Sequence, residues 1–106
     1  MEIFEDSKSF PKEETYALTD QIRRSSRSVC AQISEAYRKR IYPKSYISKL
    51  SDGDGENSET QVWLHFAFAC QYIDRITYER LNQLSKEVGK LLGDMIKYPG
   101  KYGVKV

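Results

Sequence analysis

The chain has 106 residues, of which 40% are hydrophobic and 12% are aromatic. This length allows one domain with one modest core, and nothing in the sequence suggests a second, so we expect residues 1–106 to form a single helical domain. The 17 basic and 15 acidic residues leave a formal charge of +2, which is too balanced to indicate nucleic-acid binding from net charge alone.

The two cysteines, Cys30 and Cys70, indicate neither a disulfide framework nor a zinc site, because no further cysteine and no CxxC spacing accompanies them. We expect both to be reduced and packed. No leader pattern is present, and the most apolar stretch, residues 62–73, is too short to cross a bilayer. These features favour a soluble, cytoplasmic protein with no membrane role.

Residues 1–10 have the character of the last two turns of a longer helix. Ile3 and Phe4 are followed by a polar run that ends at Phe10 and Pro11. Proline disfavours helical backbone in the residue before it, so the helix should stop here. We expect residues 1–10 to be a remnant of a first helix.

The next helix is expected over residues 12–40. Glu13 and Glu14 lie in its first turn, where the helix dipole favours negative charge, and no glycine or proline follows until Pro43. At 3.6 residues per turn, one narrow arc is apolar, which predicts a buried stripe. The stripe consists of Leu18, Ile22, Val29, Ile33 and Ala36, with Tyr37 at its edge.

A third helix is expected over residues 44–74. Its middle, SDGDGENSE, is typical of a loop, but one helical face continues through this run. That face consists of Leu50, Asp54, Asn57, Gln61, Leu64, Phe68 and Tyr72. We therefore expect a continuous helix in which Gly53 and Gly55 each cost about 1 kcal/mol relative to alanine.

Residues 62–73, VWLHFAFACQYI, are apolar on almost every side of this helix. A small monomeric bundle cannot cover all of these side chains. We therefore expect a homo-oligomer, with Trp63 and Phe66 at the contact between subunits.

The last helix is expected over residues 78–97, where apolar residues step by three and four as in left-handed bundle packing. These are Leu81, Leu84, Val88, Leu91 and Met95. Pro99 and Gly100 end the helix, and residues 98–106 form a tail.

Residues 18–40, LTDQIRRSSRSVCAQISEAYRKR, resemble the four-helix-bundle proteins encoded in intervening sequences of bacterial 23S ribosomal RNA genes. Their usual form is close to L-T-x-Q-I-R-R-(small)-x-x-S-(V/I)-x-x-N-I-A-E-(G/A). The resemblance extends through residues 10–14, 47–50, 59–64 and 72–73. Gln32, Ser34 and His65 depart from it, since the family usually has Asn and Ala, and often Asp, at these positions.

The resemblance implies an all-helical bundle without enzymatic chemistry, often a ring-shaped homo-oligomer, and five subunits is the family-based expectation. It also implies a link to nucleic acid. In the family, a full first helix precedes the Phe-Pro turn. Because a bundle helix needs three to six turns to cover its neighbours, we expect roughly fifteen to twenty-five residues of that helix to be absent here.

A polar line borders the apolar stripe and should be partly covered when helices pack, so a covered carboxylate in it needs partners. The line consists of Gln21, Ser25, Ser28, Gln32 and Glu35. We expect a structural buried network, in which Arg24 pairs with Glu35 or Asp54. Its members are Gln21, Arg24, Gln32, Glu35, Asp54, Asn57 and Gln61.

A basic strip on the 12–40 helix and its exit turn is the candidate nucleic-acid-binding surface. It consists of Arg23, Arg27, Arg38, Lys39, Arg40 and Lys44. Arginine gives phosphate a planar contact with several donors, and a ring of subunits would repeat the strip. The alternative is a solvated helix face with internal ion pairs, and the sequence leaves both open.

No catalytic set, cofactor site or small-molecule substrate is evident. The one histidine, His65, has no candidate nucleophile at a readable spacing and is expected to be a packing or surface residue. The acidic residues Asp52, Asp54, Glu56 and Glu59 do not meet the calcium-loop pattern, so we expect no metal.

Together these features predict an all-α, antiparallel helical bundle with three long helices and a short N-terminal remnant. The leading interpretation is a non-enzymatic homo-oligomer that binds RNA or DNA through the basic strip. The alternative is a protein–protein scaffold with no nucleic-acid role. Salt dependence separates the two, because binding that neutralises phosphates weakens as salt rises.

Overall fold

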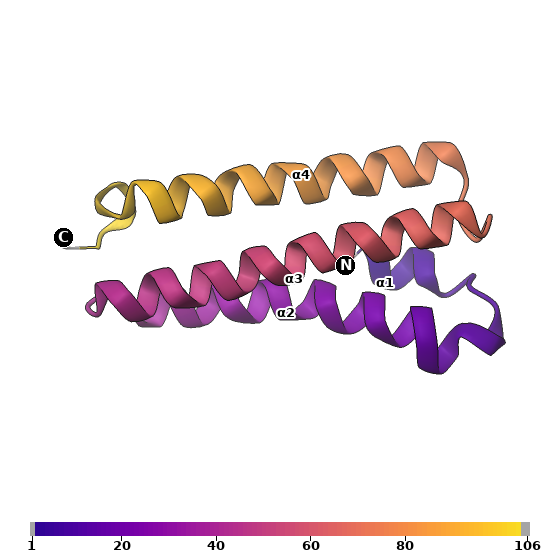
Figure 1. Cartoon of the computed structure of the whole chain (residues 1–106), viewed down its shortest axis with the longest axis horizontal. Coiled ribbons are helices and arrows are strands. Elements are labelled where there is room, and N and C mark those ends of the chain that lie inside the picture. Colours follow the sequence, from indigo (N-terminus) through magenta and orange to yellow (C-terminus); the bar gives the residue numbers. More distant parts are fainter. Residues whose placement is uncertain (1, 105–106) are drawn as a thin grey trace.

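The computed structural model describes residues 2–104, apart from the side chains of Thr15 and Tyr16. Three long helices lie side by side and alternate in direction (Figure 1): α2, Asp20–Arg38; α3, Pro43–Ala69; and α4, Arg75–Lys97. A short helix, α1 (Glu2–Ser7), lies beside one end of α2, and the described residues include no strand. The predicted all-α antiparallel bundle is confirmed.

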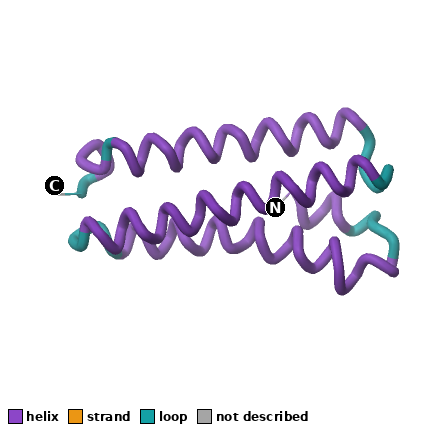
Figure 2. The backbone as a smooth tube through the Cα atoms, viewed as in Figure 1, coloured by secondary structure: helices purple, strands orange, loops and turns teal. Residues whose placement is uncertain are grey.

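The loops lie at the two ends of the bundle (Figure 2). The turn between α2 and α3 is at the same end as the C-terminus of α4, and the turn between α3 and α4 is at the other. A 3-10 helix, Pro99–Tyr102, follows α4. Segments far apart in the sequence therefore meet at each end.

The expected 12–40 helix is not regular at its start. Lys12–Glu14 forms a 3-10 turn and Thr15–Thr19 a π-helical turn, so α-helical geometry begins only at Asp20. The Glu14 side chain makes no capping hydrogen bond and so does not stabilise these first turns. The helix ends at Arg38 rather than at residue 40.

The boundary between α3 and α4 also differs from the one expected. α3 ends at Ala69, not at residue 74, because Gln71 adopts a left-handed backbone with φ of 64°. The Tyr72 N–H donates to the Ala67 carbonyl and the Gln71 N–H to the Phe68 carbonyl, both at 2.9 Å, which is a Schellman ending. Asp74 then caps α4, so that helix starts at Arg75 rather than at residue 78.

α3 is one continuous helix through the glycine-rich run. Gly53 is buried at a close approach of two helices: a Cβ built on it would lie 3.3 Å from the Gln32 Cβ of α2. Gly55 faces open space. The first glycine permits α2 and α3 to approach, and the second has no such packing role.

The core consists of two apolar clusters along the bundle axis. One contains Leu18, Ile22, Leu64, Ala67, Ile73 and Leu81, and the other contains Val29, Ala36, Tyr46, Leu50, Leu92 and Val104. The stripe predicted on α2 is buried, except that Ile33 is half-buried and Tyr37 is exposed. These clusters bury the faces along which α2, α3 and α4 meet.

The stripe predicted on α4 is only partly correct. Leu81 is buried, but Leu84 and Leu91 are 39% and 48% exposed, while Leu92 is fully buried. α3 packs along both α2 and α4, whereas α2 and α4 share few contacts. One side of α4 therefore borders a groove of about 400 Å³, lined by α2, α3 and α4 and by Glu2, Ile3 and Phe4 of α1.

Candidate nucleic-acid interface

A buried polar layer separates the two core clusters. Asn57 of α3 and Ser85 of α4 exchange hydrogen bonds, and the Gln61 Nε2 donates to the Ser85 Oγ at 3.1 Å. On the other side of α3, the Thr60 Oγ1 donates to the Ser25 Oγ of α2 at 2.9 Å. This layer joins all three long helices through short side chains.

The expected network is wrong for its charged members. Arg24, Glu35 and Asp54 are exposed. Arg24 donates to the neighbouring Gln21, and Glu35 pairs at 3.1 Å with Lys49. Neutral hydroxyl and amide groups fill the interior instead, because they lose less hydration free energy on burial than charged groups do.

Sequence reasoning placed Ser25 on the partly covered polar line but not in the network, and it missed Thr60 and Ser85 as members of this layer. All three are buried, at 1%, 2% and 7% exposure. Their sequence positions could have indicated this burial, because each lies along its helix between apolar residues that belong to different core clusters. Gln32, which was expected in the network, is half-buried, and its Oε1 is buried without a hydrogen bond to the described residues.

The structure divides the basic strip into two groups. Arg23 and Arg27 lie near the start of α2, and Arg38 ends it. Fifteen residues separate Arg23 from Arg38, which is about 22 Å along a helix. The strip is therefore not one continuous surface on a single subunit.

The first group is engaged by α1. The Arg23 Nε donates to the Ser7 Oγ at 2.8 Å, and its guanidinium lies 4.4 Å from the centre of the Phe4 ring. The Arg27 guanidinium lies 5.7 Å from the same ring. Arg23 is half-buried, and both arginines help to hold α1 against α2.

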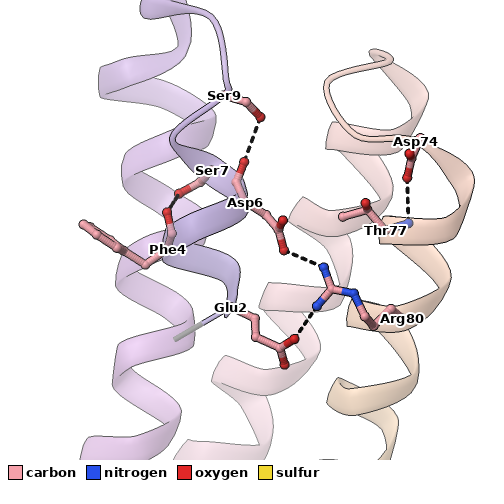
Figure 3. Close-up of polar contacts among 8 residues, drawn as sticks. All are labelled: Glu2, Phe4, Asp6, Ser7, Ser9, Asp74, Thr77 and Arg80. Carbon is pink, nitrogen blue, oxygen red and sulfur yellow. Dashed lines mark hydrogen bonds and ion pairs between the residues drawn. The ribbon is translucent and has the colours of Figure 1, made fainter.

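Arg80 of α4 holds the other side of α1. Its guanidinium points between Glu2 and Asp6 and pairs with both carboxylates (Figure 3), with 2.9 Å to the Asp6 Oδ2. These contacts, chiefly the hydrogen bond to Asp6, raise the pKa of Arg80 above its ordinary value. α1 is thus held by arginines from both α2 and α4.

The second group forms what we call the basic end, at the turn between α2 and α3. It consists of Arg38, Lys39, Arg40 and Lys44, together with Lys97 at the end of α4. The tail brings α4 to this turn: Val104 belongs to the same core cluster as Ala36, and a Cβ built on Gly103 would lie 3.7 Å from an Arg40 nitrogen.

Within residues 2–104, none of the five cations of the basic end forms an ion pair. The nearby carboxylates have other partners, since Glu35 pairs with Lys49, and Asp94 with Lys101 at 2.9 Å. The Arg40 Nε donates to the Tyr37 carbonyl at 2.9 Å, and its guanidinium lies 3.6 Å from the centre of the Tyr37 ring. The basic end is therefore an uncompensated positive surface.

The expected subunit contact is partly exposed. Phe66 is 53% exposed, and Val62, one turn before it, is 55% exposed. Trp63 is half-buried, and its indole Nε1 donates to the Glu59 Oε1 at 3.2 Å. An apolar patch of Val62 and Phe66 thus remains on the surface of α3.

The other chemical groups behave as surface residues. His65 is exposed and meets the Tyr78 ring edge-on at 6.3 Å between ring centres. Cys30 and Cys70 are unpaired, and the expectation that they are packed is wrong, because both are exposed. In the described part of the chain, no three His, Cys, Asp or Glu residues gather at a metal-binding distance, and no helix is long and apolar enough to span a membrane.

Comparison with known proteins places the chain in a family. Its residues 1–94 match the family described as 23S rRNA-intervening sequence protein. The chain belongs to this family. The family assignment agrees with the resemblance found for residues 18–40. Nearly all of that segment lies in α2.

A solved structure has the same fold as this member of the 23S rRNA-intervening sequence family. It is a protein of unknown function from the S23 ribosomal protein family of Bacteroides thetaiotaomicron, determined at 1.70 Å resolution. The two chains are 30% identical, with a TM-score of 0.75 over 90% of this chain and 98% of the relative. No curated protein matches the chain.

Proposed function

We propose that this member of the 23S rRNA-intervening sequence family is a non-enzymatic protein that binds RNA or DNA through the basic end. The observation that carries the proposal is a set of five cations at one end of the bundle without an ion pair in residues 2–104. Cations that no carboxylate neutralises are available to phosphate, whose binding releases counterions.

The two parts of the basic strip have different roles in this proposal. Arg23 and Arg27 support α1, so their substitution would disturb the fold as well as any binding. Lys39 and Lys44 are exposed and carry no ion pair within residues 2–104. They are therefore the cleaner positions at which to test phosphate binding.

The test is fluorescence anisotropy with labelled RNA and DNA oligonucleotides over a range of salt concentrations. We expect Lys39→Glu/Lys44→Glu to weaken binding and to reduce the slope of log K against log salt, by about 0.7 for each single-strand phosphate that the variant no longer neutralises. Lys86→Glu/Lys90→Glu is the matched control, since it makes the same charge change on exposed positions of α4.

Absence of binding at every salt concentration would contradict the proposal and favour a protein–protein scaffold. Equal weakening by the two lysine-pair variants would also contradict it, because the basic end would then be no better a site than any lysine-bearing surface. Circular dichroism of both variants confirms that each remains helical.

We further propose that the protein assembles as a homo-oligomer through the apolar patch of Val62 and Phe66. Their exposure on α3 leaves apolar surface in water that a second copy would cover. Sedimentation of the wild-type protein should show a species heavier than the 12.3 kDa chain. The Val62→Glu/Phe66→Glu variant should sediment as a monomer. Ile76→Glu is the control, because Ile76 is 78% exposed outside the patch. A well-folded wild-type species of one chain would overturn this proposal.

A further inference from the structure

We propose that the basic end binds single-stranded nucleic acid by stacking bases on Tyr37, Tyr42 and Tyr98, an inference that rests on the proposed function above. These three rings are 61%, 57% and 52% exposed. Exposed aromatic rings among uncompensated cations are the surface that single-strand-binding proteins use, because every base has a face that can stack.

Chain topology brings the three tyrosines to the same end of the bundle (Figure 1). Tyr37 lies in the last turn of α2, Tyr42 precedes α3, and Tyr98 follows α4. The molecule measures 47 × 24 × 17 Å, and at about 3.4 Å per nucleotide a strand of about seven nucleotides spans the 24 Å width of its end. A single strand of several nucleotides can therefore reach rings from all three helices.

Two of the three rings have a cation beside them. The Arg40 guanidinium lies 3.6 Å from the centre of the Tyr37 ring, and the Lys97 ammonium lies 5.6 Å from that of Tyr98. The Tyr42 ring is flanked in sequence by Lys39, Arg40 and Lys44. A base stacked on these rings places its phosphates among the cations that neutralise them.

The Phe4 ring, beside Arg23 and Arg27, provides a comparison, because its contacts with cations have a structural role. Phe4 lies between Lys8, Arg23 and Arg27, and it is half-buried against α2 by contacts within the chain. The tyrosines of the basic end have more than half of their surface in water. The exposed side chain of Ile41, at 77%, adds apolar surface to the same turn.

A single strand suits this surface better than a duplex does. In a duplex the bases stack on one another and present phosphates outward, so the tyrosine rings would gain no partner. In a single strand the bases can leave the stack and lie on the rings. Stacking is therefore expected to appear as a preference for single strands over duplexes with the same phosphate spacing.

The decisive measurement uses the wild-type protein and three ligands of about 12 nucleotides, a length within the range of single-strand sites. The ligands are a single-stranded RNA, the same RNA in a duplex, and an oligonucleotide in which abasic units replace every nucleotide. We expect the single strand to bind at least about tenfold more tightly than the abasic ligand, since stacking amounts to about 1–3 kcal/mol per base. Equal affinities would overturn the inference.

Variants then locate the stacking. Tyr37→Leu/Tyr42→Leu/Tyr98→Leu should lower affinity for the single strand by at least about tenfold and leave affinity for the abasic ligand unchanged. Tyr37→Phe/Tyr42→Phe/Tyr98→Phe keeps the rings and should bind as wild type does. A Leu variant that is folded by circular dichroism and binds the single strand like the Phe variant would overturn the assignment.

These outcomes separate the inference from the proposed function. If Lys39→Glu/Lys44→Glu weakens binding of all three ligands while the Leu variant weakens none, phosphate binding stands and stacking is wrong. If no ligand binds to the wild-type protein at low salt, both fail. If Lys39→Glu/Lys44→Glu weakens binding of all three ligands and the Leu variant weakens binding of the single strand alone, the proposed function and the stacking inference both hold.

Discussion

Asn57 and Ser85 are joined by two hydrogen bonds across the interface of α3 and α4. The Asn57 Nδ2 donates to the Ser85 carbonyl at 2.9 Å, and the Ser85 Oγ donates to the Asn57 Oδ1 at 2.8 Å. Asn57 is 5% exposed and Ser85 is 7% exposed, so water cannot replace either partner freely. This reciprocal pair fixes the register of one helix against the other.

Replacing Asn57 should therefore destabilise the bundle. We expect Asn57→Leu to lower the free energy of unfolding by about 1–3 kcal/mol, because Ser85 keeps its buried hydroxyl but loses its acceptor. Urea unfolding followed by circular dichroism measures the change. The neighbouring Ser58 is exposed, and Ser58→Ala should change stability by less than about 0.5 kcal/mol. Similar values for both variants would show that the pair has no register role.

The two glycines of α3 should respond differently to alanine. Gly55→Ala should raise the free energy of unfolding by about 1 kcal/mol, since its Cβ would meet open space and alanine favours helix. Gly53→Ala should gain less or lose stability, because its Cβ would lie 3.3 Å from the Gln32 Cβ. Equal gains in the two variants would mean that α2 and α3 can separate without loss.

A glycine at the end of α3 should stabilise the protein. Gln71 has a φ of 64°, a conformation that costs a residue with a Cβ about 1–2 kcal/mol and costs glycine nothing. After the greater flexibility of glycine in the unfolded chain is subtracted, we expect Gln71→Gly to gain up to about 1 kcal/mol. Gln83→Gly, at an exposed position inside α4, should lose about 1 kcal/mol. Thermal unfolding distinguishes these opposite signs.

Asp94 makes the tail sensitive to acid. Its carboxylate accepts hydrogen bonds from the Tyr102 hydroxyl and from Lys101, and these lower the pKa of Asp94 below its ordinary value. A lowered pKa means that the contribution of Asp94 to stability is present above the ordinary carboxyl pKa. The contribution is lost as pH falls through the lowered pKa.

At high pH the hydroxyl of Tyr102 limits the same contact. Its pKa is raised, first by the hydrogen bond to Asp94, so its contribution is present below the ordinary tyrosine pKa and is lost as pH rises through the raised pKa. We expect exchange of the Lys101, Gly103 and Val104 amides to be slowest between about pH 5 and pH 9, after correction for intrinsic rates. Asp94→Asn should abolish the increase in exchange rate at low pH. Glu87→Gln, at an exposed position on α4, should leave that increase unchanged.

The apolar stripe of α2 could be read from sequence because that helix packs on α3 along its whole length. Ile22 and Val29 are buried as their spacing predicts. On α4 the same spacing misplaces Leu84 and Leu91, which are exposed. Periodicity shows which face of a helix is apolar, but it does not show whether a neighbouring helix is present to cover that face.

The candidate site was predictable in its residues but not in its grouping. Arg23 and Arg38 share one helix, yet their surroundings depend on which other helix end lies beside each of them. Arg23 meets Ser7 of α1, and Arg38 shares an end of the bundle with Lys97 and Tyr98. Such neighbours come from distant parts of the chain, and no local pattern encodes them.

The central position of α3 has a consequence for how the molecule opens. Within residues 2–104, α3 packs along both α2 and α4, and these two share few contacts with each other. Detachment of α4 would expose Leu81 and Leu92, withdraw Val104 from the cluster that it shares with Ala36, and break the Arg80 ion pairs with α1. The direct contacts of α2 with α3, such as the hydrogen bond between Thr60 and Ser25, do not involve α4. The bundle can thus be described as two helix pairs that share α3, so partial unfolding can begin with the release of α4, α1 and the tail while the pair of α2 and α3 stays formed.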